Sequence, residues 1–244
     1  MVTLDLAKLT VREVNQGLCE AGEAGDYVTV LNPDARHHIG VGLTSAITVR
    51  VEGSAGYFCA GLSDQAHFEV THNVGWGVGD NMYSGSVQVG GNAGAIPGVA
   101  IRGAEIVIQG NMGSRAGQVM KAGTLCCAGD ANFMAGYMMY GGRIIILGDS
   151  GERVGEDMSA GEIFIGGKVQ ELGSDAMLSD TETSEIEDIR RFLDRYGISF
   201  KGSFSKVINA GKKLRYGSNE QQMRSLPFTS FSSGSSYWNP KVQE

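Results

Sequence analysis

GDANFMAGYMMYGGRIIILGDSGERVGEDMSAGEIFIGG, residues 129–167, contains one pattern twice. Each half begins with Gly-Asp, has a methionine ten residues later and ends in a short aliphatic run. The 19-residue spacing continues along the chain, and glycine opens five successive units: Gly91, Gly110, Gly129, Gly148 and Gly167. Counting back through His72 and Gly53 to Asp34 gives about seven units, the last ending at Gly166. A fixed period of about this length is typical of a repeat protein.

Aligning the units produces columns of similar residues. The clearest columns are position two (Ser54, Asn73, Asn92, Asn111, Asp130, Asp149), position eight (Gly79, Gly98, Gly117, Gly136, Gly155) and position eleven (Met82, Ile101, Met120, Met139, Met158, Met177). Each unit ends in a short run with alternating apolar side chains: Val49 and Val51, Phe68 and Val70, Val87 and Val89, Ile106 and Ile108, Leu125 and Cys127, Ile144 and Ile146, Ile163 and Ile165. Alternation of this kind predicts a β-strand with one buried face.

Each column has a structural interpretation. The strands are too short to stand alone, so each must pair with the equivalent strand of the next unit. The glycine columns predict a left-handed backbone or a close approach between chains. Asn and Asp at position two predict a left-handed corner that bonds its own backbone, or side chains that hydrogen-bond from unit to unit. The methionine column predicts a buried stack in the core rather than a ligand site.

Together the columns predict an all-β fold, a parallel β-helix with one 19-residue coil per unit. With coils about 4.8 Å apart, seven coils make a column roughly 30 Å long. Gly75-Trp76-Gly77-Val78-Gly79 resembles part of a dinucleotide-binding fingerprint. Another coil follows it instead of an amphipathic helix, so the pattern argues against nucleotide binding there.

Four segments are expected. Residues 1–33 form a strand–helix–strand cap, with a capping box at Thr10 and Glu13, and residues 34–178 form the β-helix. Residues 179–217 begin with a helix from Ser184 and Glu187 that lies along the column with one apolar face: Ile186, Ile189, Leu193 and Tyr196. Residues 218–244 form an extended tail in which serines alternate with aromatic residues.

The tail and one turn are the candidate contact sites. The tail aromatics Phe228, Phe231, Tyr237 and Trp238 predict an arm that packs on its own column or docks on a partner subunit. Asp34, Arg36, His37 and His38 form the densest polar cluster of the chain. This cluster is interpreted as a structured turn into the first coil, with contact to a partner's active site as the alternative.

The sequence predicts no catalytic, cofactor-binding or metal-binding residues. It contains no nucleophile motif such as GxSxG or SxxK, and none of its four cysteines forms a CxxC pair, so buried free thiols are expected. Asp130, Asp149, Glu152 and Glu156 are expected on a solvated face. The net charge of −7 argues against nucleic acid or an anionic membrane as partners. The chain shows no bilayer-spanning apolar run and no signal peptide, which predicts a cytoplasmic protein.

The coils resemble a known family. The segments NPDARHHIGVGL (32–43), NVGWGVGDNM (73–82) and 129–173 resemble the GXGXG β-helix domain of the glutamate synthase large subunit. They are most similar to its stand-alone form, the third subunit of split glutamate synthase-like enzymes, of which N-methylglutamate synthase is one. Residues 184–196 and 206–212 resemble the segment after that β-helix. The resemblance covers residues 1–215, and the tail has no counterpart.

The resemblance implies a right-handed, single-stranded β-helix that is not catalytic alone. The implied partners in a hetero-oligomer are a glutamine-amidotransferase-like subunit and an FMN-binding (β/α)₈ subunit, with an iron–sulfur cluster as an optional further cofactor of the latter. The β-helix would hold the two catalytic centres in a fixed relation. The choice between glutamate and N-methylglutamate formation stays open.

Two other functions remain open. The β-helix subunits of formylmethanofuran dehydrogenase and of the formyltransferase/hydrolase complex also have glycine coils, although the leader and the NPDARHH entry favour glutamate synthase. A free-standing carbohydrate-binding or lyase-type β-helix would have a signal peptide and more surface aromatic residues than two tryptophans provide.

Overall fold

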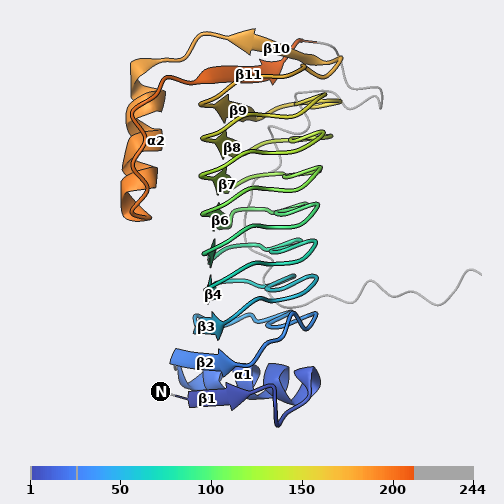
Figure 1. Ribbon diagram of the computed structural model, residues 1–244, viewed down its shortest axis with the longest axis vertical. Helices are drawn as coiled ribbons and strands as arrows, with labels where there is room; N and C mark the ends of the chain where they lie inside the picture. Colours follow the sequence, from blue (N-terminus) through green and yellow to red (C-terminus); the bar gives the residue numbers. More distant parts are fainter. Residues whose placement is uncertain (1, 26, 212–244) are drawn as a thin grey trace, which may run out of the picture. The chain divides into compact units, whose positions relative to one another are not determined.

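The computed structural model describes residues 2–25 and 27–211, which lie within one compact unit, Met1–Lys212 (Figure 1). Eleven strands form one sheet in the order β1-β2-β3-β4-β5-β6-β7-β8-β9-β11-β10. Seven of them are the repeated strands: β3 (Thr48–Glu52), β4 (His67–Val70), β5 (Ser86–Val89), β6 (Glu105–Ile108), β7 (Thr124–Cys127), β8 (Arg143–Ile146) and β9 (Glu162–Ile165). From β3 to β9, each residue pairs in parallel with the residue 19 positions later, such as Val49 with Phe68.

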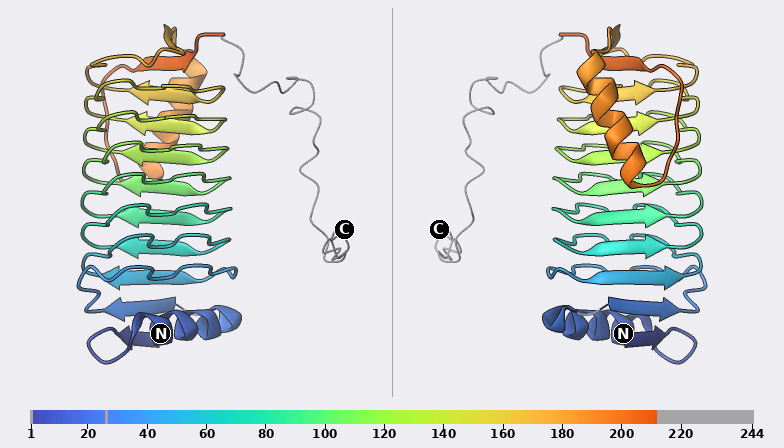
Figure 2. Two further views of the ribbon diagram at one scale, coloured as in Figure 1. Left: turned by 90° about the vertical axis from the view of Figure 1, so that its right-hand side faces the viewer. Right: turned by 90° about the vertical axis from the view of Figure 1, so that its left-hand side faces the viewer.

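The chain is therefore a parallel β-solenoid of about seven coils, as the period predicts (Figures 1 and 2). Both apolar residues of every repeated strand are buried in one continuous core. Met82, Ile101, Met120, Met139 and Met158 stack beside them, each at most 1% exposed. The core interpretation of position eleven is confirmed for these five residues.

The glycine at position one and the Asn or Asp at position two act together. The side-chain Oδ1 of Asn73, Asn92, Asn111, Asp130 and Asp149 accepts a hydrogen bond from the backbone amide 19 residues later, at 2.7–2.8 Å. A Cβ at Gly110 would lie 2.3 Å from the Asn92 Oδ1, so each bond requires glycine in the next coil. The bonding from unit to unit is confirmed. The expected left-handed corner is wrong, because the Asn and Asp residues at position two do not adopt positive φ.

Every coil turns through alternating left-handed residues. The position-eight glycines have φ between 66° and 75°, as predicted. Positions six and ten also have positive φ without being restricted to glycine: examples are Ile96 (52°), Val119 (49°) and Met138 (52°). In most coils, amides at these positions bond to carbonyl oxygens of the following coil, as in Val119 N to Tyr137 O at 2.9 Å. These hydrogen bonds hold side-chain-bearing residues in a conformation that costs them free energy.

The N-terminal cap consists of β1 (Val2–Asp5), α1 (Val11–Ala24) and β2 (Tyr27–Leu31). The capping box is confirmed, because Glu13 N donates to the Thr10 hydroxyl and Thr10 N donates to the Glu13 carboxylate. The helix ends at Gly25, whose φ of 69° suits a C-cap. Val14 and Leu18 are fully buried, so the cap closes the lower end of the core.

The C-terminal end is closed by β10 (Ala176–Ser179), α2 (Thr183–Arg195) and β11 (Ser205–Asn209). β11 pairs antiparallel with β9 and takes the place of a further coil, while β10 forms the outer edge. Met177 is therefore 45% exposed, and its prediction as a core residue is wrong. The predicted cap at Ser184 and Glu187 is also wrong: Glu182 caps α2, and Glu185 completes the capping box.

Helix α2 lies along the column, as predicted, over the outer face of β6–β9 (Figures 1 and 2). Its buried residues Ile189, Phe192 and Leu193 join a second apolar cluster with four outward-facing strand residues: Val107, Cys126, Ile145 and Phe164. The equivalent residues of β3–β5 are polar: Arg50, Glu69 and Gln88. Apolar residues therefore mark the part of the outer face that the helix covers.

Candidate partner-contact surface

The polar turn predicted at Asp34–His38 lies where the chain enters the first coil. Asp34, Ala35 and His38 have positive φ of 44°, 52° and 62°. The backbone is tied to the next coil, because Ala35 N donates to Ser54 O at 2.9 Å and Arg36 O accepts from Gly56 N at 2.8 Å. The turn is thus structured, as expected, and its side chains are exposed.

The two histidines of the turn have structural hydrogen bonds. The Nδ1 atom of His37 accepts from the backbone amide of Tyr57 at 2.9 Å, which places the imidazole proton on Nε2. The carbonyl oxygen of His38 accepts from Asn15 Nδ2 of α1 at 2.7 Å. His38 also stacks on Phe58, with ring centroids 5.7 Å apart. The turn therefore connects the cap to the coils.

An aromatic stack extends from the turn over the next two coils. We use this name for His37, Tyr57 and Trp76. The rings of His37 and Tyr57 are 4.2 Å apart and inclined by 4°, and those of Tyr57 and Trp76 are 5.4 Å apart. Tyr57 is 41% exposed and Trp76 is 54% exposed. Exposed, pre-ordered aromatic side chains are frequent energetic centres of protein interfaces.

The geometry of the stack follows from the repeat. Tyr57 and Trp76 both occupy position five, so their backbones are one coil apart. A Cβ at Gly75 would lie 2.6 Å from Tyr57 Cδ1, so the neighbouring glycine leaves room for the ring. The stack was not predicted from the sequence, although the aromatic residues shared by position five of two successive units were a signal that could have revealed it. A cleft of about 630 Å³ lies next to the turn and is lined by Leu6, Ala7, 32–36, Gly53 and Ser54.

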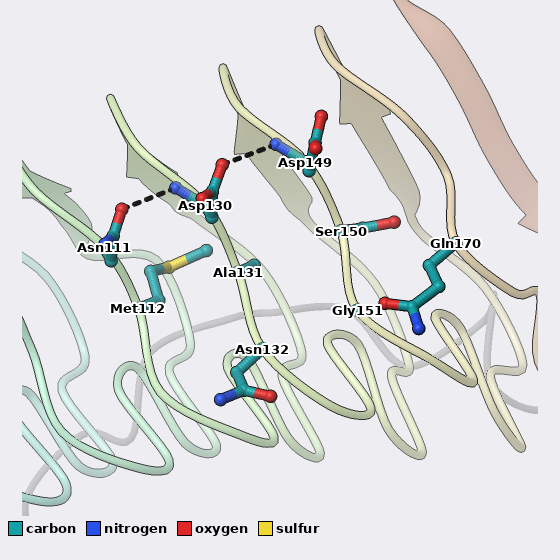
Figure 3. A pocket seen from close by; sticks show the side chains of 9 residues that line it. All are labelled: Asn111, Met112, Asp130, Ala131, Asn132, Asp149, Ser150, Gly151 and Gln170. Atoms are coloured by element: carbon teal, nitrogen blue, oxygen red, sulfur yellow. Dashed lines mark hydrogen bonds between the residues drawn. The ribbon is translucent and has the colours of Figure 1, made fainter.

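A second, shallow groove of about 350 Å³ runs over position two of the later coils (Figure 3). Its acidic residues, Asp130 and Asp149, each use Oδ1 to accept a backbone amide of the next coil. The groove therefore belongs to the hydrogen-bond ladder that holds the coils together. Within residues 2–25 and 27–211, no three His, Cys, Asp or Glu side chains gather closely enough to hold a metal ion.

Two expectations for side chains elsewhere were wrong in part. Glu156 was expected on a solvated face but is 7% exposed, where Arg153 and Ser174 bind its carboxylate and lower its pKa. Cys19 is exposed on α1, whereas Cys59, Cys126 and Cys127 are buried as expected. Burial raises the pKa of the Cys59 thiol to about 12, so it stays protonated and unreactive.

The other predicted contact residues, Phe228, Phe231, Tyr237 and Trp238, lie outside the described residues. The described residues define a β-solenoid with an exposed aromatic corner. Neither described helix has the length and apolar character that a bilayer span requires.

Comparison with known proteins supports the β-solenoid fold. The protein GlxC of Rhizobium meliloti (strain 1021) is 36% identical over 91 residues, which are 36% of this chain and 40% of GlxC. The chain thus matches less than half of that relative's length. A chain of the formyltransferase/hydrolase complex (FhcABCD) from Methylorubrum extorquens, solved with methylofuran, superimposes with a TM-score of 0.63. That likeness covers 81% of this chain and 85% of the other at 22% identity, so it establishes the shared fold. No protein-family model matches the chain.

Proposed function

We propose that this chain is a non-catalytic structural subunit of a cytoplasmic, glutamate synthase-like complex. It would hold a glutamine-amidotransferase-like subunit and an FMN-binding barrel subunit in a fixed relation during glutamate or N-methylglutamate formation. FMN, and an iron–sulfur cluster where one is present, would lie in the barrel subunit. The resemblance of the NPDARHHIGVGL and NVGWGVGDNM segments to the GXGXG domain supports this choice of complex.

The observation that carries the proposal is the aromatic stack on a rigid column. Each coil is tied to the next by strand pairing, by the position-two side chains and by the left-handed turns. Tyr57 and Trp76 are consequently ordered before any partner binds, which reduces the entropy lost on binding. A solenoid with such a corner is well suited to fixing the position of neighbouring chains.

A second candidate function is supported by the structural comparison. The solved chain with the same fold belongs to a formyltransferase/hydrolase complex. This chain could therefore be the β-helix subunit of such a complex, or of formylmethanofuran dehydrogenase. Both candidates place the chain in a hetero-oligomer, and they differ in the chemistry of the partners.

Co-purification of the native chain distinguishes them. We expect affinity purification from the source cells to recover two larger chains, one with flavin absorbance, which mass spectrometry would identify. Amidohydrolase-like partners without flavin would favour the second candidate. A homo-oligomer free of other chains would contradict both.

Tyr57→Ala/Trp76→Ala tests the role of the stack. Because both rings are largely exposed, we expect unchanged thermal unfolding but at least tenfold less co-purified partner. Met177→Ala is the matched control, since Met177 is 45% exposed at the opposite end of the sheet. Equal recovery of partners by the double variant and the control would show that the stack is not a contact.

A further inference from the structure

A stripe of four side chains lies on a different corner of the coils. We use the name basic stripe for Tyr83, Arg102, Lys121 and Tyr140, which occupy position twelve of four successive coils. Each backbone amide donates to the position-eleven carbonyl of the preceding coil, as in Arg102 N to Met82 O and Lys121 N to Ile101 O, both at 2.9 Å. The four side chains are thus fixed in register about 4.8 Å apart.

The two central residues are cations without an acidic partner. Among the described residues, neither Arg102 nor Lys121 forms an ion pair, and Arg102 Nε is buried without a hydrogen-bond partner. Burial, followed by repulsion from Arg102, lowers the pKa of Lys121. By contrast, Arg50 and Glu69 are stacked with the same 19-residue offset and form an ion pair. Like charges on adjacent coils repel each other, so the arrangement has a cost within this chain.

The tyrosines flank this pair of charges and face solvent. Tyr83 is 53% exposed and Tyr140 is 38% exposed, and the guanidinium of Arg102 lies over the Tyr83 ring at 5.0 Å. Small residues border the stripe, because a Cβ at Gly103 or Gly141 would lie 2.8 Å or 2.4 Å from a backbone carbonyl of the preceding coil. Tyrosine and arginine are among the residue types enriched at the centres of protein interfaces.

We propose that the basic stripe binds an extended, acidic peptide segment of a partner subunit. The inference rests on the proposed function, because it specifies the chemistry of one partner contact. Three coil spacings span about 14 Å, the length of about four extended residues. Two carboxylates of such a segment would pair with Arg102 and Lys121, and its flanking residues would pack on the tyrosines.

The charge of the chain favours a short acidic peptide over nucleic acid. Nucleic-acid binding depends on many phosphate contacts and a broad positive field. This chain has a net charge of −7, and the stripe offers two cations. A local contact between carboxylates and two fixed cations remains favourable in an otherwise repulsive field, since paired charges at short range outweigh screened charges farther away.

Fluorescence anisotropy on the full chain tests the proposal. The probe is fluorescein-labelled hexaglutamate, with hexaglutamine and a single-stranded RNA hexamer as comparison probes, at low and high ionic strength. We expect hexaglutamate to bind and the other two probes not to bind. Arg102→Gln/Lys121→Gln should weaken hexaglutamate binding at least tenfold, and Tyr83→Ala/Tyr140→Ala should weaken it severalfold.

Arg190→Gln/Lys201→Gln is the matched control. It removes the same two charges from exposed residues outside the stripe, and it should keep the wild-type affinity within twofold. Equal losses in both double variants would show unspecific attraction and overturn the proposal. Absence of hexaglutamate binding to the wild-type chain, or tighter binding of the RNA hexamer, would overturn it as well. Lys121→Gln alone, with unfolding followed by circular dichroism, repeats the test if the double variant folds poorly.

The outcome is separable from that of the proposed function. If hexaglutamate does not bind while the native chain still co-purifies with partners, the basic stripe is not an acidic-peptide site and the structural-subunit proposal stands. Hexaglutamate could bind in the expected way while the native chain purifies as a homo-oligomer. The basic stripe would then be an acidic-peptide site, and the proposed complex would be wrong.

Discussion

At the scale of single residues, the coil depends on positions where a side chain has no room or no favourable conformation. From Gly91 onward, position one needs glycine because a carboxamide or carboxylate oxygen of the preceding coil occupies the space of its Cβ. From Gly79 onward, position eight needs glycine because its φ is positive and an added Cβ would also lie only 2.4–3.3 Å from a core side chain. Positions six and ten tolerate Ile96 and Val119 in the same left-handed region, because bonds to the following coil stabilise that conformation.

Gly136→Val should therefore destabilise the chain strongly. Gly136 has a φ of 75°, and its Cβ would lie 2.4 Å from Ile163 Cδ1. We expect a loss of about 3–5 kcal/mol in the free energy of unfolding, measured by denaturant titration. Gly42→Val is the control: its φ is 74° and no atom lies within 4 Å of the added Cβ, so about 1–2 kcal/mol should be lost. Equal losses in Gly136→Val and Gly42→Val would show that steric crowding around residue 136 does not add to the destabilisation.

Thiol reactivity should separate the cysteines by burial. Burial raises the pKa of Cys59 and Cys126 to about 12 and raises the pKa of Cys127 well above its usual 9.0. These thiols remain protonated below those values, so we expect one thiol per native chain, Cys19, to react with a disulfide reagent at pH 8. All four should react in denaturant. More than one fast-reacting thiol in the native chain would contradict the burial of the strand cysteines.

At the scale of elements, much could be predicted from the sequence. The strands and the apolar face of α2 follow from periods of 2 and 3.6 residues, and the capping box of α1 follows from the spacing of Thr10 and Glu13. The site of α2 on the column was also encoded, because outward-facing residues become apolar from Val107 onward. The insertion of β11 beside β9 could not be predicted from the local sequence pattern, because it depends on which strand, distant in the sequence, β11 pairs with.

Glu105→Gln should loosen α2 in a pH-dependent way. Burial raises the pKa of Glu105, but hydrogen bonds from Tyr196 and Arg195 outweigh this effect and lower it below its usual 4.5. A lowered carboxyl pKa stabilises the fold above pH 4.5 and loses that effect as pH falls through the folded-state value. At pH 7, we expect the variant to be about 1–2 kcal/mol less stable than wild type.

The difference between wild type and Glu105→Gln should shrink between pH 7 and pH 3, because the wild-type carboxylate is protonated as the pH falls through its folded-state pKa. Thermal unfolding followed by circular dichroism at both pH values measures it. Glu187→Gln removes the same charge from an exposed residue of α2 and should show little effect at either pH. If the stability difference between wild type and Glu105→Gln did not change with pH, Glu105 would stabilise the fold through packing and not through its charge.

At the scale of the whole molecule, the surface was harder to predict than the core. The columns predict which residues are buried, because every coil repeats the same contacts. The aromatic stack and the basic stripe differ from coil to coil, so periodicity alone does not distinguish them. The Asp34–His38 turn could be predicted from its dense polar residues. Tyr57 and Trp76 are 19 residues apart in the sequence, and only the structure shows that their rings stack.

Deletion of residues 218–244 tests the tail at this scale. The compact unit ends at Lys212, so we expect thermal unfolding of the remaining chain to be unchanged. Recovery of partner chains in co-purification should fall, because the deletion removes Phe228, Phe231, Tyr237 and Trp238. Unchanged recovery would favour the alternative in which the tail packs on its own column.

The uniform 19-residue offset between β3 and β9 has a consequence for evolution and engineering. Outside the stretch that α2 covers, each coil contacts only its neighbours, so duplicating or deleting one complete unit there would leave the remaining pairings intact. Anything bound at the two ends would then move apart or together in increments of about 4.8 Å. Separations between these steps are not accessible, so related solenoids should differ in length by multiples of a whole coil.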